Sequence, residues 1–250
     1  MQLHHLDSVP ASARPGIETW FSTVLSAFEN EIDSVYLYGS IVTPDYKPKE
    51  SDINSMILFT TFSFEGVIRL QPFVQKGLKS RIVAPLCLGV ETFERSADTF
   101  PMEFIEIQDK HLCIYGVDRV ASLPIPTEPL RVKIEEQIKG KLIRLRQIFM
   151  EHGQEPKYLK PVLEEALREL LPVFRNMLRF QGVEQPPIVK QAILEELQRV
   201  NSLSLEPCFR VLNSLENAKP IPPAEVVPVY SEFADRLLQL GRVIDQLEQA

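Results

Sequence analysis

The residues with the clearest chemical potential lie between positions 38 and 59. A Gly39-Ser40 pair follows an apolar run, and after an eleven-residue spacer Asp52 and Asn54 open a second apolar run. Residues two positions apart on a strand point to the same face, so the side-chain oxygens of Asp52 and Asn54 can address one cation. A Gly-Ser turn lets phosphate oxygens approach backbone N–H groups and a hydroxyl closely. The pattern predicts a site for a metal-bound phosphate.

This arrangement resembles the nucleotidyltransferase superfamily, which includes DNA polymerase beta, kanamycin nucleotidyltransferase and the aminoglycoside adenylyltransferases. The family signature is Gly-Ser, a spacer of similar size, Asp-x-Asp on a strand, and a third carboxylate on a later strand. Gly39, Ser40 and Asp52 match this signature, whereas Asn54 stands where the family has its second Asp. The resemblance covers roughly residues 30–118 and, more loosely, the remainder of the chain.

The candidate for the third carboxylate is Glu103, in the segment PMEFIEI. We predict a strand over residues 102–107, on which Glu103 and Glu106 face opposite sides. The resemblance favours Glu103 as the acid in the cleft, where a half-buried carboxylate can act as a general base. Either glutamate can instead be an ordinary solvent-facing acid.

The resemblance implies transfer of a nucleoside monophosphate, most simply AMP from ATP, to a hydroxyl of a small molecule or protein. Gly39 and Ser40 would bind the triphosphate, and Asp52, Asn54 and Glu103 would hold Mg²⁺, with Asp52 and Glu103 as the catalytic pair. An amide offers a metal an oxygen but no charge. The alternative is therefore a catalytically degenerate binding or regulatory module that keeps the fold.

Each of these residues also has an ordinary structural interpretation. Asp52 can be an exposed loop acid, and Gly39-Ser40 a turn at the end of a strand. The basic residues that could meet phosphate are equally compatible with solvated surfaces; they are Lys47 and Lys49 in the spacer, six residues within 131–146, and Arg175 with Arg179.

Composition narrows the class of protein. The net charge of −7 argues against general nucleic-acid binding. No stretch of about 18 consecutive apolar residues is present, so we expect no membrane span. The three cysteines are odd in number and widely spaced, which favours reduced thiols and a cytoplasmic protein. The sequence leaves open the acceptor, the nucleotide base and whether the chain forms a homo-oligomer.

Hydrophobic periodicity predicts an α/β (α+β) domain with a small mixed sheet over residues 1–121, followed by an all-α helical bundle over 130–250. A proline-rich stretch, 122–129, is the predicted linker. The expected elements of the first domain are helices 17–28 and 64–79 and strands 34–38, 53–61, 82–88, 102–107 and 111–115. The expected helices of the second are 130–151, 157–170, 173–181, 188–200, 205–215 and 227–248.

Overall fold

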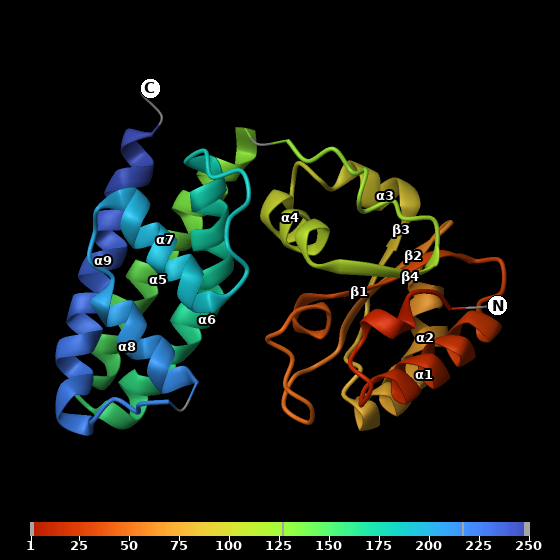
Figure 1. The fold of residues 1–250 in the computed structure, drawn as a ribbon, viewed down its shortest axis with the longest axis horizontal. Helices are drawn as coiled ribbons and strands as arrows, with labels where there is room; N and C mark the ends of the chain where they lie inside the picture. The colour runs from red at the N-terminus through yellow and green to blue at the C-terminus, as the bar shows by residue number, and fades with distance from the viewer. Residues whose placement is uncertain (1–2, 127, 217, 248–250) are drawn as a thin grey trace. The chain divides into compact units, whose positions relative to one another are not determined.

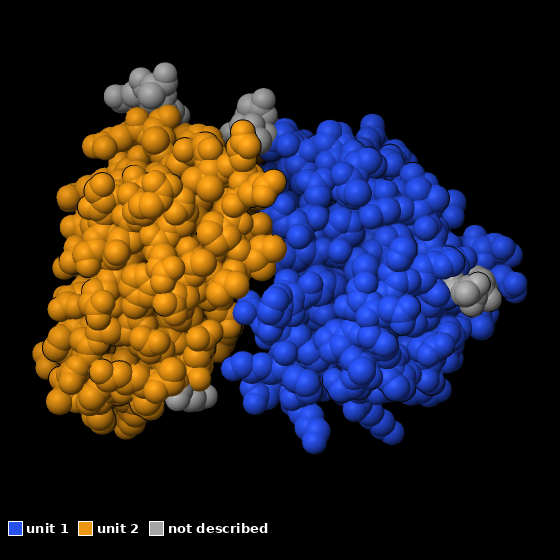
Figure 2. All heavy atoms as spheres, viewed as in Figure 1, with its two compact units in different colours: residues 1–126 blue, residues 127–250 orange. Residues whose placement is uncertain are grey.

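The computed structural model describes residues 3–126, 128–216 and 218–247, and it divides the chain into two compact units, residues 1–126 and 127–250 (Figures 1 and 2). The division falls within the stretch predicted as linker. Leu123, however, is buried in the core of the first unit. Within the described ranges, no helix is both long and apolar enough to cross a bilayer.

The first unit is built on a four-stranded sheet with the order β3-β2-β1-β4. The central strand β1 (Ile32–Tyr38) pairs antiparallel with β2 (Asn54–Phe59) and with β4 (His111–Gly116). The edge strand β3 (Leu86–Gly89) pairs parallel to β2. The sheet is therefore small and mixed, as predicted. The strand expected over 82–88 is shorter, and only an isolated bridge joins Ile53 to Ile82.

One face of the sheet packs on the helices α1 (Arg14–Ala27) and α2 (Phe64–Gly77). Alternate β1 residues such as Val35 and Leu37 point to this face and are fully buried. Trp20 ties the two helices together, because its indole Nε1 donates a hydrogen bond to the Phe73 carbonyl at 2.8 Å.

The opposite face packs on α3 (Val90–Arg95) and α4 (Pro101–Asp109), through a cluster that joins Tyr36 and Met56 to Phe104. The prediction of a strand over 102–107 is wrong, because this segment forms α4. Proline is favoured at the first position of a helix, and Pro101 occupies it here. The apolar residues also follow a helical spacing, since strict alternation fails at two adjacent buried positions, Phe104 and Ile105.

The second unit is helical throughout its described elements, which Figure 1 shows packed side by side. Helix α6 is continuous across Pro161 and Pro172, where two helices were expected. The helices are α5 (Glu128–His152), α6 (Pro156–Phe180), α7 (Lys190–Asn201), α8 (Glu206–Leu215) and α9 (Val226–Gln246).

Two basic residues of the second unit, Arg175 and Lys139, are engaged by neighbours. Arg175 is buried and its Nε donates to the Pro187 carbonyl at 2.9 Å, so it anchors the segment before α7. Lys139 of α5 pairs with Glu135 and with Asp245 of α9. These contacts give both cations a role in the bundle itself.

Candidate functional site

The predicted Gly-Ser turn lies where β1 ends. Gly39 has a φ of +78°, in the left-handed region that favours glycine, and begins a short 3-10 helix, Gly39–Val42. Its N–H donates to the Lys110 carbonyl at 3.1 Å, which holds the turn against the residue before β4. Ser40 is half-buried beside it. The turn is thus a fixed end of the sheet with a polar surface.

Asn54 lies directly beside this turn. It is the first residue of β2 and pairs in register with Tyr38, the residue that precedes Gly39. Its side-chain Nδ2 would be 3.4 Å from a Cβ built on Gly39. The structure therefore brings Gly39, Ser40 and Asn54 together, and the group that faces the turn is a neutral amide.

Asp52 precedes β2 and forms an ion pair with Arg81. The distance from the Arg81 Nη2 to the Asp52 Oδ1 is 2.8 Å, and the two side chains are 42% and 55% exposed, respectively. The Ile53 N–H also donates to the Arg81 carbonyl at 2.8 Å, which fixes Arg81 to the start of the strand. The sequence contains no signal for this partner, because Arg81 lies 29 positions downstream and belongs to no motif.

Glu103 is exposed on α4, within a helix and not on a strand. One of the two strands beside β2 is the edge strand β3. Its residues Leu86, Cys87, Leu88 and Gly89 carry no carboxylate. The other predicted acid, Glu106, forms an ion pair with Lys110 at 2.8 Å, with both side chains largely buried. The other neighbour of β2 is β1, and its one carboxylate, Asp33, pairs with Arg119 at the end of the strand away from Asn54. Neither neighbouring strand therefore brings a third acid to the Gly39 turn.

These donors do not fit the Mg²⁺ centre that the resemblance implies. Such a centre needs several anionic oxygens around the ions. Here Asn54 is neutral, Asp52 is paired with a guanidinium, and Glu103 lies on a helix. Among the described residues, no group of three or more histidine, cysteine or acidic side chains is arranged to hold a metal ion.

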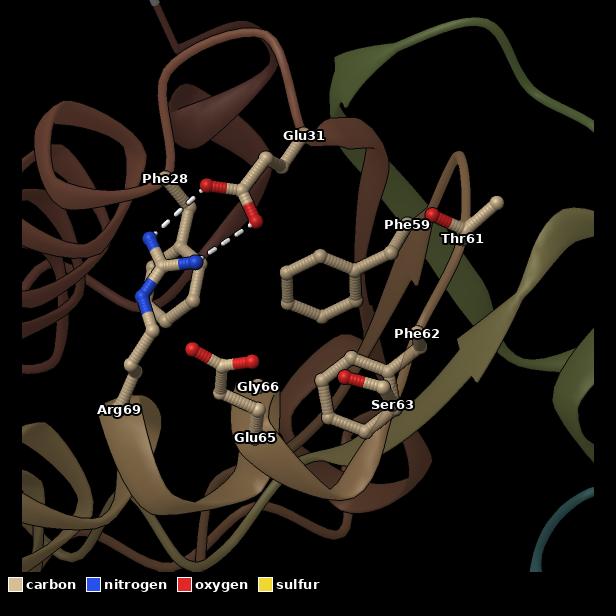
Figure 3. Close-up of a pocket in the computed structure, with 9 residues that line it drawn as sticks. All are labelled: Phe28, Glu31, Phe59, Thr61, Phe62, Ser63, Glu65, Gly66 and Arg69. Atoms are coloured by element: carbon tan, nitrogen blue, oxygen red, sulfur yellow. Dashed lines mark hydrogen bonds and ion pairs between the residues drawn. The ribbon is translucent and has the colours of Figure 1, made fainter.

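A separate pocket of about 260 Å³ lies at the opposite end of the β1–β2 ladder (Figure 3). Arg69 pairs there with Glu31 through two hydrogen bonds of 2.8 and 2.9 Å and lies over the Phe28 ring at 4.5 Å. Figure 3 shows the Glu65 carboxylate directed at the same space. Glu65 lies in the first turn of α2, where an acid stabilises the helix dipole. These contacts pack the first part of α2 against the end of the sheet, at a place distinct from the Gly39 turn.

Comparison with solved structures finds a protein with a similar fold. No family model matches the chain, and no curated protein sequence is significantly similar to it. Among solved structures, the chain is similar to spectinomycin adenyltransferase AAD(9) from Enterococcus faecialis, solved with ATP and spectinomycin. The identity is 14%, the TM-score is 0.54, and the match covers 89% of this chain and 98% of that one. The chain therefore has the fold of a nucleotidyltransferase of the aminoglycoside adenylyltransferase type.

Proposed function

We propose that this chain is a nucleotidyltransferase-fold binding module, which holds a nucleoside triphosphate at the Gly39 turn and does not turn it over. The observation that carries this proposal is the neutral amide of Asn54 facing Gly39. A carboxylate at this position would repel a triphosphate unless a metal ion lay between them. An amide instead offers N–H donors to phosphate oxygens. The site therefore favours binding of an anion without the metal that transfer would need.

The turn adds further donors to this site. The Gly39 N–H is already bound to the Lys110 carbonyl, but Gly39 has no side chain to obstruct an approaching phosphate. The Ser40 hydroxyl can donate to the same oxygens. Together with Asn54, these groups form a small neutral surface suited to phosphate.

A second function is favoured by a specific observation, the similarity to an adenyltransferase whose structure holds ATP and spectinomycin. In this alternative the chain transfers AMP from ATP to a hydroxyl of a small molecule or protein, with Asp52 and Glu103 as the catalytic pair. Asp52 would first have to leave Arg81. Glu103 would also have to be brought to the turn from α4.

Calorimetric titration with ATP, once with EDTA and once with Mg²⁺, tests the first proposal. We expect binding in EDTA, weakened at least tenfold by Gly39→Ala, because the added methyl obstructs the turn. Arg95→Gln is the control, since the Arg95 side chain is exposed and pairs with Glu91, one turn earlier on α3. No ATP binding under either condition would contradict the proposal.

Pyrophosphate release separates the two functions. A binding module releases none when ATP and Mg²⁺ are supplied with a mixture of hydroxylated acceptors, including spectinomycin. Release that disappears in Asp52→Ala, with ATP binding retained, would establish the transferase instead. Release that is unaffected by Asp52→Ala would identify a contaminating activity.

A further inference from the structure

We propose that Arg81 takes the place of the metal ion at this site, so that its guanidinium neutralises Asp52 and binds the phosphate of the ligand. The inference rests on the proposed function, because it names the cation that serves the same turn. It is based on the hydrogen bonds that fix the main chain and side chain of Arg81, on the guanidinium donors without a partner among the described residues, and on the positive charge of the guanidinium.

The main chain of Arg81 is fixed in an unusual conformation. Its φ is +59°, a left-handed value that a non-glycine residue adopts at a cost. Its N–H donates to the Leu78 carbonyl at 3.1 Å, and its carbonyl accepts from Ile53. The conformation therefore fastens Arg81 to the residue between Asp52 and Asn54.

The Arg81 side chain donates hydrogen bonds to three consecutive residues. The Nε donates to the Ser51 carbonyl at 3.0 Å, and the Nη2 donates both to the Glu50 carbonyl at 2.5 Å and to the Asp52 carboxylate at 2.8 Å. Contacts with two carbonyls fix the plane of the guanidinium independently of Asp52. The cation would thus stay in place if the carboxylate lost its charge.

One edge of the guanidinium remains available. Within the part of the chain that the structure describes, Nη1 donates no hydrogen bond, and the side chain is 42% exposed. An arginine presents its N–H groups as a planar fork suited to phosphate oxygens. The Nη1 group is therefore a ready donor to an anion at this end of the sheet.

The charges at the site are consistent with this substitution. Of the three side chains, Arg81 carries one positive charge, Asp52 one negative charge and Asn54 none. The sum is zero, so no net negative charge remains to attract a divalent ion. A cation bound to Asp52 would also lie close to the guanidinium and be repelled by it. The pair therefore disfavours the metal and leaves the N–H donors of Nη1 for phosphate.

The test compares Asp52→Asn with Arg81→Gln by ATP titration in EDTA. We expect Arg81→Gln to lose at least tenfold in affinity. Asp52→Asn should bind ATP as tightly as the parent protein or up to several-fold more tightly, because the substitution removes a charged acceptor that competes with phosphate for the guanidinium. Arg95→Gln is again the matched control. Unchanged affinity in Arg81→Gln, or a loss in Asp52→Asn, would overturn the proposal.

A second measurement does not depend on ATP. Electron paramagnetic resonance of added Mn²⁺ should show no binding to the parent protein at millimolar concentration. The double variant Arg81→Gln, Asn54→Asp should bind Mn²⁺, because it removes the cation and adds a carboxylate beside Asp52. Binding of Mn²⁺ to the parent that Asp52→Asn abolishes would overturn the inference. If the parent protein binds no ATP at all, the proposed function fails, and the manganese spectra still decide whether Arg81 excludes the metal.

Discussion

Two ends of the central strand β1 use the same residue types for different purposes. At one end Gly39 has a φ of +78°, and the nearby Asp52 pairs with Arg81. At the other end lie Gly116, with a φ of +79°, and the ion pair of Asp33 with Arg119. Gly116 is opposite Ser34 in the β1–β4 ladder, and His111 is opposite Tyr38, so the two glycines mark its two limits.

The surroundings of the two ends differ. A Cβ on Gly116 would lie 2.0 Å from the Asp33 carbonyl oxygen, whereas one on Gly39 would meet only a side-chain atom at 3.4 Å. The Arg119–Asp33 pair is bidentate, with both contacts at 2.8 Å, and the Asp33 side chain is 19% exposed. The Asp52–Arg81 pair is a single contact near solvent. The Gly116 end is closely packed, whereas the Gly39 end has the open space that the proposed ligand site requires.

The largest effect is expected from Gly116→Ala. A methyl group in collision with backbone, at a positive φ, should destabilise the first unit by about 3–5 kcal/mol. Gly39→Ala should cost only about 1–2 kcal/mol, the strain of the φ alone. Urea unfolding measures both. The control is Gly140→Ala, where a Cβ meets nothing within 4 Å and helix stability should rise. Equal losses at Gly39 and Gly116 would erase the contrast between the two ends.

Tyr36→Phe is expected to have the next largest effect. The fully buried Tyr36 hydroxyl accepts from the Arg119 N–H at 2.9 Å and is 2.9 Å from the Val117 carbonyl. Its removal leaves the partners without a hydrogen bond, at a cost of about 1–3 kcal/mol in the free energy of unfolding. Tyr46→Phe is the control, because the Tyr46 hydroxyl makes no hydrogen bond within the described residues. A cost below that of the control would show that water replaces the lost contacts.

The pH dependence of stability should reveal the Asp33 pair. The hydrogen bond from Arg119 lowers the pKa of Asp33 below its ordinary value. The ionised carboxylate therefore stabilises the fold, fully above the pKa of about 3.9 in the unfolded chain, and the stabilisation is lost as the pH falls through the lower folded pKa. Urea midpoints between pH 6 and 2.5 should fall less in Asp33→Asn than in the parent protein. Parallel pH profiles would contradict this assignment.

The smallest effect on stability is expected from Asp52→Asn. Exposed ion pairs contribute about 0–1 kcal/mol, so the free energy of unfolding measured by urea titration should fall by less than about 1 kcal/mol. The same variant is expected to bind ATP at least as tightly as the parent protein. A stability loss as large as that of Tyr36→Phe would place Asp52 in the structural framework.

Much of the fold could be predicted because local patterns determined it. The apolar spacing of α1 and the runs in β1 and β2 follow the burial that the structure shows. The strand prediction fails for the α4 segment because its alternating start matches a strand, although Pro101 is favoured at the first position of a helix. The prediction of two helices fails at Pro172, where α6 stays continuous.

The site was predictable only in part, for a physical reason. Gly39, Ser40 and Asn54 lie close together because a short spacer joins the two neighbouring strands that carry them. The spacing of these residues in the sequence is enough to predict that arrangement. Arg81 reaches Asp52 through the loop before β3, and such contacts depend on tertiary packing that no local pattern encodes. The roles of Asp52, Asn54 and Glu103 as metal ligands stay predictions that the titrations above will decide.

Trp20, whose indole joins α1 to α2, gives the two units separate optical signatures. It is the single tryptophan of the chain and is 7% exposed within the first unit. Its fluorescence should shift to longer wavelength when α1 separates from α2, and it reports nothing directly from the helices of residues 127–250. Circular dichroism at 222 nm, by contrast, draws on the helices of both units. Divergence of the two curves in one urea titration would show the units unfolding one at a time, without cutting the chain.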